Sequence, residues 1–139
     1  MNRPFVELMS ERERQNVSRL VADYSPVQSI PEIWSIAAQK FGQLPALHAP
    51  HLKPEVKLSY AELHRLIQQF AVGLQVLGVQ TGDRISLFSD NSPRWFIADQ
   101  GMMTAGAANA VRSSQADREE LLFILQNSGS IGLVVEDLA

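Results

Sequence analysis

The chain has 139 residues, of which 45% are hydrophobic and 19% charged, and its formal net charge is −3. This composition is typical of one globular domain with a core of its own, and the interspersed charges disfavour nucleic acid, which needs a basic patch. The absence of cysteine excludes disulfides, thiolate zinc sites and a cysteine nucleophile. No apolar run reaches the roughly 18 residues of a membrane-spanning helix. The N-terminus also lacks the apolar segment of a signal peptide, so we expect a cytoplasmic location.

Residues 1–28 are expected to form an N-terminal helical arm, followed by a partial subdomain over 29–139. Ser10 and Glu13 match a capping box, and apolar residues then follow at helical spacing, which predicts an amphipathic helix over 11–23. Docking of this helix on the domain is the favoured interpretation. Its arginines would also allow contact with a membrane surface, although neighbouring acidic residues dilute their charge.

The segment between residues 29 and 78 predicts two helices separated by a β-hairpin. Each helix opens with a Ser-x-x-Glu capping box, at Ser29 and at Ser59, and each is followed by a glycine that stops it. Between them, two short runs of strand character flank a loop, which is the arrangement of a hairpin. The predicted elements are a helix from about 29 to 41, strands at 45–49 and 56–59, and a helix at 60–77.

From residue 84 onward, strand and helix patterns alternate in the order β-α-β-α-β. Right-handed crossovers would make the three strands parallel, so the fold class is α/β: a parallel sheet with flanking helices and a small N-terminal hairpin. If the strands were added in one direction, both crossover helices would lie on one face and the helix at 60–77 would cover the other. The predicted strands are 85–88, 108–111 and 131–135, and the predicted helices are 93–107 and 115–127.

The last predicted strand is apolar throughout, which is typical of a parallel strand buried on both faces. Only residues 136–139 follow it, with no further helix. A parallel sheet that ends there exposes an edge, which could pair with a second copy. The simplest interpretation is an incomplete subdomain at the front of a larger protein.

Two stretches have some features of a nucleotide-binding site. Gly101 and Gly106 have the spacing of a phosphate-binding loop, but Ala107 and Ala108 stand where Lys and Ser or Thr must follow. They lie in a predicted helix, so they indicate close packing through small residues. The loop at 89–93, after the first parallel strand, has no glycine that would let the backbone approach a pyrophosphate. We therefore predict no cofactor-binding residue in this chain.

His48, His51 and His64 could together hold a metal ion. No carboxylate at a suitable spacing supports such a site, and a structural role is favoured for all three. The adjacent carboxylates at 119–120 and 136–137 are interpreted as solvated surface, because neighbours on a helix point apart. We therefore predict no metal ligand and no catalytic residue.

The most distinctive cluster is Asn91, Pro93, Arg94 and Trp95, just after the first parallel strand. Ser92 would cap the next helix, with Pro93 in its first turn, while Asn91 could bond the turn backbone. Trp95 would fill the gap between sheet and helix, so Trp95→Ala should unfold the domain at a cost of ~3–5 kcal/mol. Ligands of open α/β sheets bind beyond the carboxyl ends of the strands. A binding role therefore competes with the structural one, which we favour.

Short motifs over residues 30–137 occur in the order found at the front of the AMP-forming acyl-adenylating enzymes, which the chain resembles. They are Leu58-Ser59-Tyr60-Ala61-Glu62-Leu63, Gly73-Leu74, Leu77-Gly78-Val79, Thr81-Gly82-Asp83-Arg84-Ile85, Asn91-Ser92-Pro93-Arg94-Trp95, Gly106-Ala107, Ile124-Leu125-Gln126-Asn127-Ser128 and Val134-Val135-Glu136-Asp137. The loop at 50–55 and the Asn-x-Pro-x-Trp form are most similar to the long-chain fatty acid branch. Within it, the chain resembles the acyl-acyl carrier protein synthetases of the cyanobacterial type.

The resemblance implies that the parent enzyme uses ATP and Mg²⁺ to convert a fatty acid into an acyl-adenylate. The thiol of coenzyme A or of an acyl carrier protein then attacks that adenylate. The family's Gly-rich loop ending in lysine has no counterpart here, because Lys40, Lys53 and Lys57 are the only lysines and none follows a Gly-rich run. The family's acidic ligands and C-terminal lysine are also missing, so no catalytic residue is carried over.

The chain is therefore expected to be inactive alone and to serve as a scaffold that packs against the rest of the same enzyme. One departure concerns the acyl tunnel: the family's Pro-rich or Tyr-Pro segment after the second parallel strand is replaced by Ala110-Val111-Arg112-Ser113-Ser114. The alternative hypothesis is a free-standing α/β module that binds a protein partner through its exposed sheet edge or its N-terminal arm.

Overall fold

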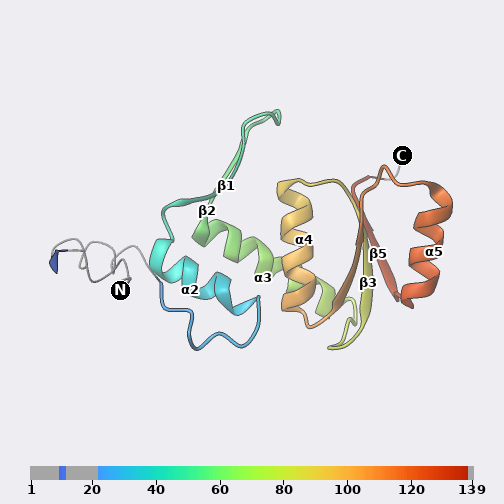
Figure 1. Cartoon of the computed structure of the whole chain (residues 1–139), viewed down its shortest axis with the longest axis horizontal. Helices are drawn as coiled ribbons and strands as arrows, with labels where there is room; N and C mark the ends of the chain where they lie inside the picture. The colour runs from blue at the N-terminus through green and yellow to red at the C-terminus, as the bar shows by residue number, and fades with distance from the viewer. Residues whose placement is uncertain (1–9, 12–21, 138–139) are drawn as a thin grey trace, which may run out of the picture.

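The computed structural model describes residues 10–11 and 22–137, and Figure 1 shows two layers of helices on either side of a small sheet. The helix predicted at 11–23 falls largely outside the described residues, so the arm and its boundary at residue 28 stay predictions. The elements are α2 (Glu32–Phe41), β1 (Pro45–Ala49), β2 (Val56–Ser59), α3 (Tyr60–Val76), β3 (Arg84–Phe88), α4 (Pro93–Thr104), β4 (Ala108–Arg112), α5 (Arg118–Ser128) and β5 (Gly132–Val135). The predicted α/β class is confirmed.

Helix α2 begins differently from the prediction. Pro31 occupies the N-cap position and no side chain caps the helix. The Ser29 hydroxyl donates instead to the Glu32 carboxylate at 2.6 Å, and the Gln28 N–H donates to the same group at 3.1 Å. The serine and glutamate of the predicted box therefore bond each other across the start of the helix, in which Pro31 is the N-cap and Glu32 the first helical residue.

Strands β1 and β2 form the predicted antiparallel hairpin, with Leu47 opposite Leu58 and Ala49 opposite Val56. The hairpin projects from the body of the molecule above α2 and α3 (Figure 1). All residues of its loop at 50–55 are exposed. The hairpin is therefore attached to the domain only at its base.

Helix α3 is built as its sequence predicts. Ser59 Oγ accepts from the Glu62 N–H at 3.3 Å, and the Glu62 carboxylate accepts from the Ser59 N–H at 2.8 Å, which completes the capping box. Leu63, Ile67, Ala71 and Leu74 are buried along one side. The buried face ends one turn earlier than predicted, because Leu77 is the C-cap and is 82% exposed.

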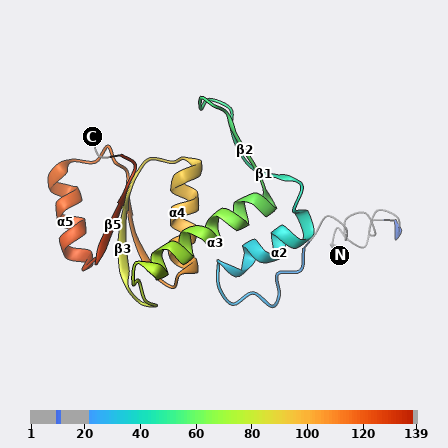
Figure 2. The same ribbon diagram turned by 180° about the vertical axis from the view of Figure 1, so that it is seen from behind.

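The three-stranded sheet is parallel, as predicted, but its strand order is β4-β3-β5. The expectation of strands added in one direction is wrong: the chain leaves β3 to form β4 on one side and returns across it to form β5 on the other. With right-handed crossovers, this reversal places α4 and α5 on opposite faces, as Figures 1 and 2 both show. Helix α3 therefore packs against α4 on the same side of the sheet and does not cover the opposite face.

The core lies between the sheet and the layer formed by α3 and α4. Ile85 and Leu87 point into it from β3, and Met102, which is 0% exposed, enters it from α4. On the opposite face, Ser86 and Phe88 are buried beneath α5. Both faces of the central strand are therefore covered.

Strand β5 departs from the prediction of burial on both faces. Leu133 is 44% exposed and Val135 is 40% exposed. Both share the α5 face with Ser86 and Phe88, but α5 lies over β3 and β4 and contains no fully buried residue. Strand β5 has the apolar sequence that is typical of a buried strand. Its side chains on the α5 face are exposed because no described element covers this edge of the sheet.

Candidate functional site

The loop between β3 and α4 holds the predicted Asn91, Pro93, Arg94 and Trp95 cluster. Ser92 is the N-cap of α4, with its hydroxyl accepting the Trp95 N–H at 3.0 Å, and Pro93 is buried in the first turn. Asn91 is exposed, and no hydrogen bond joins it to another described residue. The cap of α4 is therefore supplied by Ser92, while Arg94 and Trp95 project from the first turn.

Trp95 is only partly buried, against the sequence expectation of a ring enclosed between sheet and helix. It packs at the margin of the core with its ring 6.5 Å from that of Phe96, centroid to centroid. Part of the ring faces an open groove. Truncation to alanine should therefore cost less than the ~3–5 kcal/mol of a fully buried tryptophan.

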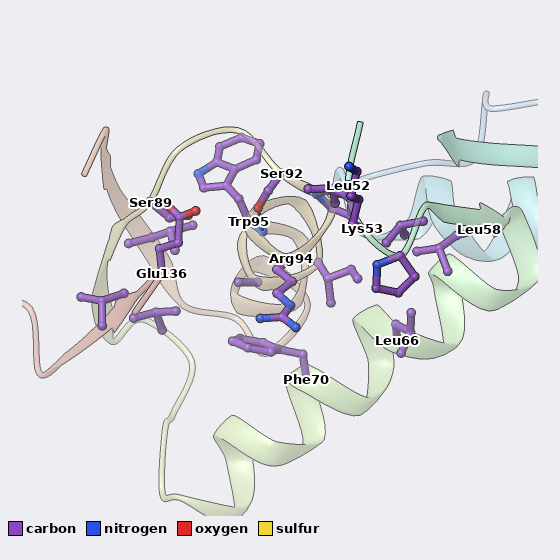
Figure 3. Close-up of a pocket in the computed structure, with 18 residues that line it drawn as sticks. Leu52, Lys53, Leu58, Leu66, Phe70, Ser89, Ser92, Arg94, Trp95 and Glu136 are labelled. Atoms are coloured by element: carbon purple, nitrogen blue, oxygen red, sulfur yellow. Dashed lines mark hydrogen bonds between the residues drawn. The ribbon is translucent and has the colours of Figure 1, made fainter. Parts of the chain in front are cut away.

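A groove of about 770 Å³ runs from the hairpin loop across α3 and the first turn of α4 to the ends of β3 and β5. Its walls are mainly apolar, and Figure 3 shows the Arg94 side chain extending into it toward Phe70. Ser89 and Glu136 lie at the sheet end, and Lys53 lies at the hairpin end. The other lining residues are Leu52, Pro54, Val56, Leu58, Leu66, Leu87, Ser92, Pro93, Trp95, Ile97, Ala98, Val134 and Val135.

The sheet end of the groove coincides with the carboxyl ends of the strands, which are tied together by polar side chains. The Asp90 N–H donates to the Glu136 carboxylate at 3.3 Å, and the Ser113 hydroxyl donates to the Asp90 carboxylate at 2.5 Å. The Ser114 hydroxyl also reaches Glu136, at 3.5 Å. The acidic residues here are therefore engaged in holding the three strand ends.

Helix α4 is held in place by a polar chain on the side away from the groove. Trp34 Nε1 donates to Gln100 Oε1 at 2.7 Å, and Gln100 Nε2 donates to Asp99 at 2.9 Å. Asn109 Nδ2 of β4 donates to Asp99 Oδ1 at 2.8 Å. These bonds link α2, α4 and β4 and so fix the position from which Arg94 and Trp95 enter the groove.

The residues that could hold a metal or a nucleotide do not come together. His48 pairs with Glu55 on the hairpin, and His64 faces Gln68 on α3. In the described ranges, no group of three His, Cys, Asp or Glu residues could hold a metal ion. The glycine-free loop after β3 gives no backbone cradle for phosphate. The described residues thus do not provide ligands for the ATP and Mg²⁺ used by the family that the sequence resembles, and no chemical step is assigned to this part of the chain.

The groove itself was not predicted from the sequence. Leu66 and Phe70 carry the helical periodicity of α3, and both line the groove and are only half-buried. Leu58 and the hairpin loop contribute a wall that depends on how the hairpin sits on α3. The available signal was the run of apolar residues at helical spacing along α3.

Comparison with known proteins agrees with this architecture. The AMP-binding enzyme family model matches residues 34–139, so the chain belongs to that family. It is 46% identical over 110 residues to the chloroplastic long-chain-fatty-acid–[acyl-carrier-protein] ligase AEE15 of Arabidopsis thaliana, covering 79% of this chain and 15% of that protein. It is also 29% identical over 116 residues to the long-chain-fatty-acid–CoA ligase heimdall of Drosophila melanogaster, covering 81% and 17%.

Among solved structures, the N-terminal domain of FACL13 from Mycobacterium tuberculosis matches with a TM-score of 0.73 and 27% identity. The match covers 78% of this chain and 27% of that domain. The chain therefore spans about a sixth of the length of the curated relatives it matches. The resemblance noted in the sequence is confirmed, as is its place at the front of the family's larger domain.

Proposed function

We propose that this chain is the N-terminal part of an AMP-forming ligase that activates long-chain fatty acids and transfers them to a thiol. The observation that carries the proposal is the 46% identity to a ligase of that class over 110 residues. In this role the chain supplies three strands of a sheet and the helices that cover them. The ATP and Mg²⁺ chemistry would reside in the remainder of the enzyme.

The thiol acceptor is either acyl carrier protein or coenzyme A, since the matched relatives include a ligase named for each. The greater identity to the carrier-protein ligase favours the carrier protein. We retain the cytoplasm as the proposed location. Contact of the N-terminal arm with a membrane also stays a proposal, and within the described ranges no helix is long and apolar enough to cross one.

The test is ATP–pyrophosphate exchange with palmitate, measured on two proteins. This chain alone should show no exchange, because it contains no phosphate-binding loop. A chimera in which residues 30–137 replace the matching segment of the Arabidopsis ligase should retain fatty-acid-dependent exchange. The unmodified ligase is the control. Exchange by the chain alone, or a folded chimera without exchange, would overturn the proposal.

A free-standing interaction module is the second candidate, and one observation favours it. Leu133 and Val135 expose an apolar strip along the free edge of β5, which could receive a strand from another protein. A chimera without activity, together with a chain that stays folded and monomeric until a partner is added, would support this alternative.

A further inference from the structure

Helix α5 covers its face of the sheet alone, since Figures 1 and 2 place the other described helices on the opposite side. It contributes no fully buried residue, whereas α4 buries Ala98 and Met102. The side chains that α5 turns toward the sheet, Leu121, Ile124 and Leu125, are only half-buried. Because the free energy of apolar packing scales with the area buried, α5 is held less firmly by its core contacts than α4 is.

Hydrogen bonds tie the two ends of α5 to the sheet. At the first turn, Arg112 Nε of β4 donates to Glu120 Oε1 at 2.6 Å, but both side chains are nearly half exposed, and exposed pairs of this kind contribute little. At the last turn, Arg84 Nη1 of β3 donates to the Ser128 carbonyl oxygen at 2.8 Å. This bond also places a positive charge at the negative end of the helix dipole. Arg84 is therefore the principal clamp on α5.

The segments on either side of α5 are held by bonds that do not involve the helix. Before it, the Ser113 hydroxyl donates to the Asp90 carboxylate at 2.5 Å. After it, the Ile131 N–H donates to the Arg84 carbonyl oxygen at 2.8 Å. The N-cap residue, Asp117, makes no side-chain hydrogen bond that would fix the first turn. Helix α5 can therefore lose its turns without detaching β4 or β5 from the central strand.

Loss of α5 would change the surface of the sheet. Phe88 of β3 is 6% exposed beneath α5, and it lies in register with Val135 of β5, which is 40% exposed. Ser86 lies in register with Leu133 in the same way. Uncovering β3 would therefore join Phe88 to the apolar side chains that are already exposed on β5, and the two strands would present one continuous apolar face.

We propose that α5 is a conformational cover that opens by local unfolding while the sheet and the α3–α4 layer stay folded. Opening exposes the apolar face of β3 and β5, closing hides β3 again, and Arg84 sets the balance by clamping the last turn. Opening breaks few apolar contacts, whereas global unfolding must also break the core around Met102, so the first requires less free energy. The inference does not rest on the proposed function.

The test is amide hydrogen exchange of the whole chain, followed by NMR at urea concentrations below the unfolding midpoint. Amides of α5 should exchange at least about a hundredfold faster than the slowest amides of α3 and β3. The α5 rates should depend only weakly on urea, because local opening exposes little surface. The rates of the slowest amides should rise steeply with urea, because global unfolding exposes much more.

Substitutions separate local opening from global unfolding. Gly101→Ala perturbs the contact between α3 and α4, which stays intact when α5 opens, so it should leave the α5 rates unchanged and raise the α3 rates about five- to thirtyfold. Arg84→Gln should raise the rates in both regions about tenfold, because the clamp is lost in either kind of opening. The matched control is Arg118→Gln, which removes an exposed arginine from the first turn of α5 and should raise neither rate.

Equal exchange rates in α5 and β3 with the same dependence on urea would overturn the inference. So would a Gly101→Ala variant in which the rates of both regions rise equally. If Arg84→Gln and Arg118→Gln gave the same α5 rates, the role of Arg84 as the clamp would be wrong. Thermal melts establish that each variant is folded, and if Gly101→Ala does not fold, the urea dependence of the parent chain decides by itself.

Discussion

At the residue scale, Gly101 shows how a single missing side chain sets a helix–helix contact. A Cβ built at this position would lie 2.7 Å from Phe70 Cδ1 and 2.9 Å from Phe70 Cβ. The α3 and α4 backbones therefore approach more closely at this point than any other residue would allow. Gly106 has a different role, because it turns the chain after α4 with a φ of 85°.

Gly101→Ala should lower the free energy of unfolding by about 1–2 kcal/mol, since overpacking at Phe70 outweighs the better helix propensity of alanine. Gly73→Ala in α3 is the matched control, because its Cβ would meet nothing within 4 Å. That variant should raise stability by up to about 1 kcal/mol. Urea denaturation of both variants measures the difference. Similar stability changes of the same sign would show that α3 and α4 are not in tight contact.

The glycines at 101 and 106 lack the lysine that phosphate binding needs, and the sequence therefore indicates close packing at this point. The sequence does not predict that Phe70 of α3 is the residue that packs against Gly101. This contact depends on the distance between two helices whose sequences are separated by the turn at Gly78 and by β3. Contacts of this kind follow from tertiary packing and leave no local signal.

At the scale of elements, the capping box of α3 gives a pH-dependent contribution to stability. Hydrogen bonds from the Ser59 backbone N–H and then from its hydroxyl lower the pKa of Glu62 from 4.5. A carboxyl group whose pKa is lower in the folded state than in the unfolded state stabilises the fold at pH values above its unfolded-state pKa. That stabilisation is lost as the pH falls through the lowered, folded-state pKa.

Glu62→Gln should therefore melt at a lower temperature than the parent chain at pH 7, and the two curves should converge as the pH falls through the lowered pKa of Glu62. Glu119→Gln, which removes an exposed first-turn glutamate from α5, controls for the loss of charge. Differential scanning calorimetry between pH 3 and pH 7 measures the effect. A difference between Glu62→Gln and the parent that stays constant across this range would show that the box does not form.

The first residues of the helices and the positions of the strands follow from local sequence patterns, and the sequence predicts most of them. Ser59 and Ser92 cap the helices assigned to them, because capping involves residues within one turn of each other. The start of α2 was misplaced because Pro31 occupies the N-cap position. The start of α5 was also displaced, from 115 to Arg118, since Ser113 and Ser114 bond the strand ends and leave the helix uncapped.

At the scale of the whole molecule, the edge strand β5 leaves apolar side chains on the surface. Leu133 and Val135 are exposed on the α5 side of the strand, and Phe123 of α5 is 65% exposed. Edge strands with apolar side chains and no covering element promote pairing with another chain. The chain by itself should therefore self-associate as its concentration rises.

Leu133→Lys should reduce this self-association, because a charged side chain at the edge opposes strand pairing. Val76→Lys is the control: Val76 is 82% exposed, lies at the C-terminal end of α3 and is not part of a strand. Sedimentation velocity over a range of concentrations distinguishes the two. Equal association by both variants would mean that another surface mediates it.

Taken alone, the sequence determined the α/β class, the parallel strands, the hairpin and the family, because each depends on periodicity, caps or short motifs that lie close together in the chain. Only the tertiary structure decided the strand order β4-β3-β5 and the position of α3 beside α4. It also decided the exposure of β5 and the groove into which Arg94 extends. The physical reason is that crossover handedness is local, whereas the side of β3 on which each strand docks depends on packing between residues far apart in the sequence.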